Sequence, residues 1–120
     1  MKEVGNLKQK ETGKGGKVSW RKLTEIVLIS PPFEKKIINN REIEAFVELY
    51  NNRKKMRKFS IGNSSGWSKR AIISMGKQQY DIIFSGRNIL VNKRKYIMDV
   101  SIDSELDEFY HSLNEPELNY

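Results

Sequence analysis

A run of cations, RKKMRK at residues 53–58, is the densest group of chemically useful side chains in this 120-residue sequence. Lysine and arginine neutralise phosphates, and aromatic rings beside them can stack on exposed bases. The stretch GNSSG at 62–66 leads from this run to a tryptophan and a second basic pair. We therefore predict a binding surface made of Arg53, Lys54, Lys55, Arg57, Lys58, Trp67, Lys69 and Arg70.

The same cations have a structural explanation. Positive side chains suit the negative end of a helix dipole, and lysines on strands and hairpin tips discourage sheets from pairing edge to edge. The sequence has no ribonucleoprotein motif, helix-turn-helix pattern or zinc module. We keep a nucleic-acid or anionic-polymer binder as the alternative function, and it predicts binding that weakens as salt rises.

No catalytic or metal-binding constellation accompanies this surface. His111 is the single histidine, and its place off the apolar stripe of a helix predicts exposure to solvent. Asp81 and Asp99 lie in apolar strand-like runs, where strand alternation predicts that Asp81 faces solvent near a cross-strand lysine or arginine. The loop 62–66 lacks the Lys-Ser/Thr that completes a phosphate cradle. We expect no enzymatic activity, no cofactor and no metal.

The elements that would position these residues follow from apolar periodicity. Four short apolar runs at 71–75, 80–84, 88–91 and 95–100 are separated by turn residues, as in an antiparallel meander with two hairpins. Strands are also predicted at 22–30 and 34–38, with a break at Pro31-Pro32. The glycine-rich segment 60–68 is expected to be a mobile loop that carries Trp67.

Two helices are predicted, at 41–52 and 105–113, because each has apolar residues at i, i+3, i+4 and i+7. Asn39 is expected to cap the first helix, and Asp103 or Ser104 the second. The predicted fold is an α+β domain whose antiparallel sheet, a four-strand meander with one or two N-terminal strands, packs against the first helix while the second closes one end. The expected core is Ile26, Leu28, Phe46, Val47, Tyr50, Ile72, Ile82, Phe84, Ile97, Leu106 and Phe109.

Length and charge bound the organisation. We predict a flexible basic leader at 1–19, one domain at 20–114 and a tail at 115–120. The net charge is +7, but residues 101–120 contain six acidic residues and no lysine or arginine. We therefore expect this acidic segment to lie near a basic patch. Cysteine is absent, which excludes disulfides and thiolate zinc sites. No apolar run reaches the roughly 18 residues of a membrane span.

From Gly66 onward, the segment containing QYDIIFSGRNILVNKRKYIMDV and the helix SELDEFYHSL resembles small exported or lipid-anchored domains of unknown function from low-GC Gram-positive bacteria. The resemblance implies the fold and an envelope location behind a removed leader. The lipid-modified cysteine of such proteins is missing from this sequence, and as written the chain is expected in the cytoplasm. A second resemblance, to toxin-immunity proteins, implies an inhibitor of one partner. We predict a non-enzymatic binding or inhibitory module with a protein partner.

Overall fold

The computed structural model describes residues 23–57 and 66–120, which form a mixed α/β domain. Eight strands make one antiparallel sheet in the order β3-β7-β6-β5-β4-β1-β2-β8. The strands are β1 (Glu25–Ser30), β2 (Phe33–Ile37), β3 (Lys55–Arg57), β4 (Lys69–Met75), β5 (Gln78–Ser85), β6 (Asn88–Val91), β7 (Arg94–Met98) and β8 (Leu118–Asn119). The helices are α1 (Asn40–Asn51) and α2 (Asp103–Ser112).

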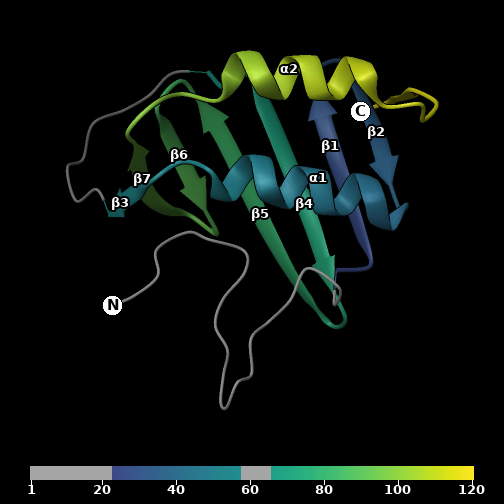
Figure 1. The fold of residues 1–120 in the computed structure, drawn as a ribbon, viewed down its shortest axis with the longest axis horizontal. Helices are drawn as coiled ribbons and strands as arrows, with labels where there is room; N and C mark the ends of the chain where they lie inside the picture. The colour runs from purple at the N-terminus through teal and green to yellow at the C-terminus, as the bar shows by residue number, and fades with distance from the viewer. Residues whose placement is uncertain (1–22, 58–65) are drawn as a thin grey trace.

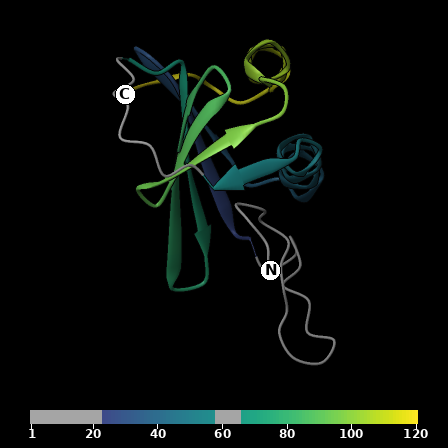
Figure 2. The ribbon, with the colours of Figure 1, turned by 90° about the vertical axis from the view of Figure 1, so that its left-hand side faces the viewer.

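Both helices lie on the same side of the sheet. Figure 1 shows α1 crossing the middle of the strands, while α2 runs along one end of them. Figure 2, turned by 90°, shows the sheet nearly edge-on with both helices to one side of it. We call the covered side the helix face. We call the other side the helix-free face, because neither α1 nor α2 lies over it.

The four strands of the meander form three hairpins, whereas two were predicted. Each hairpin is closed by a two-residue turn. Met75 pairs with Gln78, Ser85 with Asn88 and Val91 with Arg94. Two of these turns begin with a glycine at positive φ, whereas Asn92 and Lys93 both adopt positive φ in the third. Positive φ at the turn residues matches the twist of the flanking strands and fixes the register. The segment 88–91 is thus a separate strand.

The prediction of a four-strand meander with one or two further strands gave too few strands, because both edge strands were missed. β3 pairs three residues with β7 and contains part of the basic run. β8 pairs two residues with β2 and lies in the segment 115–120 that was expected to be a tail. The start of the predicted first strand and the whole predicted leader lie outside the residues that the structure describes.

The N-terminal cap follows the prediction in one of the two helices. Asn39 Oδ1 accepts the backbone N–H groups of Arg41 and Glu42, so it caps α1 as expected. The predicted cap of α2 is wrong. Ser101 Oγ accepts the Asp103 N–H, whereas the Asp103 carboxylate reaches the Gly86 N–H at 3.0 Å and ties the β5–β6 turn to the helix.

The core fills the space between the sheet and the two helices. Eight of the predicted core residues are buried, and three are not: Phe109 is half-buried against the core, and Ile72 and Ile97 lie on the helix-free face. Both of these isoleucines were assigned to the wrong side because their strands have apolar residues on both faces. Their neighbours Ala71, Ile73, Tyr96 and Met98 are the residues that face the helices.

Candidate functional site

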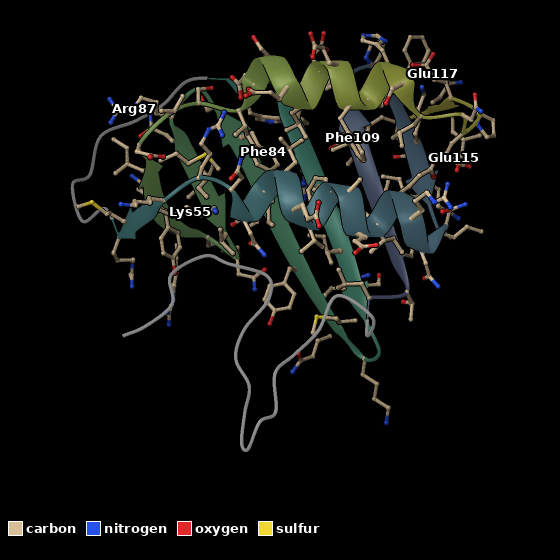
Figure 3. The ribbon with its side chains drawn as sticks, in the orientation of Figure 1. Lys55, Phe84, Arg87, Phe109, Glu115 and Glu117 are labelled. Atoms are coloured by element: carbon tan, nitrogen blue, oxygen red, sulfur yellow. The ribbon has the colours of Figure 1, made fainter. Side chains whose placement is uncertain are left out.

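The predicted basic surface does not form one patch, because several of its cations turn inward. Lys55 is 5% exposed, and its Nζ donates to the carbonyl oxygens of Tyr50 at 2.6 Å and Arg53 at 2.9 Å. The amine also lies 4.1 Å from the centre of the Tyr50 ring. Figure 3 shows this lysine beside the end of α1. Lys55 therefore satisfies carbonyls that the end of the helix would otherwise leave unpaired.

The second helix ends in the same way. Lys35 on β2 is 7% exposed and donates to the carbonyl oxygens of Tyr110 at 2.9 Å and Leu113 at 3.0 Å. Its amine lies 4.6 Å from the centre of the Tyr110 ring. Burial raises the pKa of the Tyr110 hydroxyl, and Glu117, then Glu34, add to the rise. We call Lys35 and Lys55 the capping lysines.

Burial lowers the pKa of Lys55 to about 8, because the charged amine is separated from water. Its pKa in the unfolded chain is near 10.5, so the unfolded chain binds more protons between pH 8 and 10.5. Stability should therefore rise with pH in this window. We expect a gain on the order of 1 kcal/mol between pH 8 and 9.5 by urea unfolding. Lys55→Met should remove most of this gain, and an unchanged pH dependence in that variant would contradict the assignment.

Two further cations of the predicted surface are paired with the acidic helix. Arg53 forms an ion pair with Glu105, and Lys69, which is buried, donates to Asp107 at 3.0 Å. The hydrogen bond from Lys69 holds the pKa of Asp107 below its usual value. These contacts show that the acidic helix lies against basic residues, as expected, although the two cations come from separate elements rather than from one patch. They join α2 to the α1–β3 connection on one side and to β4 on the other.

Arg70 lies on the helix-free face as part of a cluster with aromatic residues. Its guanidinium donates two hydrogen bonds of 2.9 Å to Asp81 and one of 3.1 Å to the Tyr120 hydroxyl. The Trp67 ring meets the Tyr120 ring edge-on, with centroids 6.3 Å apart. The prediction that Asp81 faces a cross-strand cation is thus confirmed. We call Trp67, Arg70 and Tyr120 the aromatic–arginine cluster.

What remains exposed of the basic run lies at the opposite edge of the sheet. Lys54 and Arg57 are exposed, and Arg57 lies over the Tyr96 ring at 5.8 Å. Pairing of β3 with β7 brings Arg57 close to the basic β6–β7 hairpin, which carries Lys93, Arg94 and Lys95. Lys58 and residues 62–65 lie outside the described ranges. Trp67 is about four strand spacings, or about 19 Å, from this edge, so the structure does not bring it to the basic run.

The helix-free face has aliphatic side chains at its centre, on both sides of the Arg70–Asp81 ion pair. Strands β1, β4, β5, β6 and β7 each contribute one or two aliphatic side chains to this face. On β3, Met56 adds an exposed apolar side chain. This surface was not predicted from the sequence. Its signal was nevertheless present, because the strands have apolar residues at both odd and even positions, and therefore on both faces of the sheet. The aliphatic residues of this face are Val27, Ile29, Ile72, Ile83, Leu90 and Ile97; Ile29 is buried and the others are half-buried.

The carboxylates are arranged differently from the expected pair. Asp81 is committed to Arg70, while Asp99 follows β7 and accepts the backbone N–H of Lys54. Instead, Glu42 on α1 meets Glu115, and its pKa is raised by burial and then by this neighbour. His111 is exposed, 3.5 Å from Asp107. Over residues 23–57 and 66–120, no group of three or more acidic, histidine or cysteine side chains is placed to hold a metal ion.

No helix among the described residues is both long and apolar enough to cross a membrane. Comparison with protein-family models, with curated proteins and with solved structures found no match to this chain.

Proposed function

We propose that this chain is a non-enzymatic protein-binding module and that the helix-free face is its contact surface. The observation that carries the proposal is the apolar centre of this face, which neither helix covers. Aliphatic side chains on this many strands of an uncovered sheet face are characteristic of protein-binding sites rather than of an ordinary solvated sheet. Such a domain acts by occupying a surface of its partner, as inhibitory modules of the immunity type and envelope-associated domains do.

The charges on the face also support a protein partner. The strand residues that point to this face include three acidic and three basic side chains, so the face has no excess of positive or negative charge. A phosphate polymer would need an excess of cations there. The charged residues are Glu25, Glu34, Asp81, Lys36, Arg70 and Lys95.

The aromatic–arginine cluster provides anchor residues at one side of the face. Tryptophan, tyrosine and arginine are the residue types that contribute most to binding at protein interfaces. Tyr120 is 55% exposed, so its ring presents area to a partner. The ion pair with Asp81 fixes the Arg70 guanidinium, which in turn donates to the Tyr120 hydroxyl. Because both side chains are already ordered, they lose less conformational entropy when a partner binds.

Ile83→Lys tests the proposal, because it places a charge at the centre of the apolar surface. We expect at least about a tenfold loss of the partner that the immobilised protein captures from an extract of its source cells, quantified by mass spectrometry. Gln78→Lys is the matched control, since Gln78 is an exposed residue of the same strand on the helix face. Thermal unfolding would verify that both variants fold. Equal capture by the two variants would contradict this contact surface.

The alternative, an anionic-polymer binder, is favoured by one observation: Lys54 and Arg57 are exposed beside the basic β6–β7 hairpin. Titration with labelled single-stranded and double-stranded oligonucleotides at low and physiological salt separates the two functions. A steep loss of affinity with salt, reduced by Arg57→Ala, would support the alternative. A protein-binding module should show no such binding at physiological salt.

A further inference from the structure

The segment that follows α2 wraps around the β2 edge of the sheet. On the helix side, Glu117 accepts a hydrogen bond of 2.8 Å from the Tyr110 hydroxyl. On the helix-free face, the Tyr120 hydroxyl accepts one of 3.1 Å from Arg70. Figure 2 shows the end of the chain on the side of the sheet away from both helices. We call residues 114–120 the strap, and it ends at the rim of the proposed contact surface.

The groups that receive the strap are held in place without it. β2 pairs with β1 along all five of its residues. Two hydrogen bonds of 2.9 Å to Asp81 fix the Arg70 guanidinium. On either side of Trp67, hydrogen bonds of 2.9 and 3.1 Å hold the backbone to β5. The site would therefore keep its shape if the strap left it, and a preformed site loses little entropy on binding.

The strap is recognised through its backbone and through one tyrosine. Its strand β8 pairs two residues with β2, and the Tyr120 N–H donates to the Pro32 carbonyl oxygen at 3.0 Å. The tyrosine side chain bonds to Arg70 and meets the Trp67 ring edge-on, with centroids 6.3 Å apart. Backbone pairing with a sheet edge, combined with specific side-chain contacts, is a common way to bind an extended peptide.

The strap is also held weakly. Its ladder is two residues long, and Pro116 has no N–H with which to extend it. Leu118 is 46% exposed and Tyr120 is 55% exposed, so burial contributes little to its attachment. Glu115 lies beside Glu42, a side chain of like charge on α1. Such a segment belongs to the least stable part of the domain and can open locally while the rest stays folded.

We propose that the β2 edge, Trp67 and Arg70 form an acceptor site for an extended peptide that contains a tyrosine, and that the strap fills this site until the protein partner supplies such a segment. The inference rests on the proposed function, because it specifies what the partner contributes at the rim of the helix-free face. The partner's segment then places its own tyrosine where Tyr120 lay, so the aromatic–arginine cluster keeps its aromatic anchor.

Competition by the strap sets the size of the expected effect. A short tether gives the strap an effective concentration on the order of 1 mM. If the open site binds a free peptide with a dissociation constant of about 100 µM, the intact strap weakens that binding about elevenfold. A strap whose own affinity has fallen about tenfold weakens it only about twofold. Loosening the strap should therefore tighten peptide binding about fivefold.

Fluorescence anisotropy of a fluorescein-labelled peptide NEPELNY, the sequence of residues 114–120, measures this competition with the full chain at about 150 mM salt. Tyr120→Ala in the chain should bind the peptide about fivefold more tightly than wild type does. Asn119→Ala is the matched control, because it truncates the neighbouring side chain and keeps the tyrosine; its affinity should stay within about twofold of wild type. Adding Arg70→Ala to the Tyr120→Ala chain should abolish the gain.

The same peptide carrying Tyr120→Ala should bind no chain at up to about 1 mM protein, and this keeps the test decisive even if the Arg70 variant does not fold. Equal affinities of the wild-type and Tyr120→Ala chains for NEPELNY would overturn the proposal, as would equal binding of the two peptides or no binding at all. If NEPELNY fails to bind but Ile83→Lys abolishes partner capture, the acceptor site is wrong and the proposed function stands. If the peptide binds as expected while Ile83→Lys leaves capture unchanged, the acceptor site stands and the helix-free face is not the contact surface.

Discussion

Phe46→Ala is expected to lower the free energy of unfolding by about 3–5 kcal/mol, the largest effect of a single truncation in this domain. Phe46 is fully buried on α1, and its ring lies 6.3 Å from that of Tyr50 and 6.1 Å from that of Phe109 on α2. Removing the ring leaves a cavity where the sheet and both helices meet. Urea unfolding monitored by circular dichroism measures the change.

Phe33→Ala is the matched control for this substitution. Phe33 begins β2 and is 39% exposed, so its truncation removes the same atoms from a site that water already reaches. We expect a loss of at most about 1 kcal/mol. Similar losses for the two phenylalanines would mean that the space between the helices is not the principal core.

Lys35→Ala should cost about 2–3 kcal/mol, a large effect for a lysine. The substitution leaves the carbonyl oxygens of Tyr110 and Leu113 without their charged donor and removes the amine from the Tyr110 ring. The adjacent Lys36 is exposed and faces the other side of β2, so Lys36→Ala should change stability by no more than about 0.5 kcal/mol.

The comparison between these adjacent lysines separates a capping role from a general effect of positive charge. Equal losses from both substitutions would remove the capping interpretation. Hydrogen exchange adds a local measurement, because only Lys35→Ala should speed the exchange of amides in the last turn of α2.

The sequence was most informative where one physical rule acted alone. Strand alternation correctly placed Asp81 on the same face as a cation of the neighbouring strand, and Asn39 capped α1 as its position indicated. Alternation assigned Ile72 and Ile97 to the wrong face, because a strand that is apolar on both faces does not show which of them is turned toward the core. The predicted cap of α2 failed because Asp103 bonds to a β-turn that is distant in sequence.

The basic run shows why composition alone could not define the site. Lys54 and Lys55 are identical in type and adjacent, yet one is exposed and the other is buried under the end of α1. Their difference comes from the pairing of β3 with β7, which sets the face of each side chain. That pairing joins residues about 40 apart in the chain, and no local pattern specifies a three-residue edge strand.

The path of α1 carries a mechanical consequence. The helix connects β2 to β3, which lie on either side of five other strands, so the connection must span about six spacings, or about 29 Å. Twelve helical residues reach about 18 Å, and the five linking residues add at most about 17 Å. The connection can therefore reach about 35 Å, about 6 Å more than the crossing requires. Deleting two of its residues would use up this margin, whereas added residues would form a longer loop at little cost in free energy.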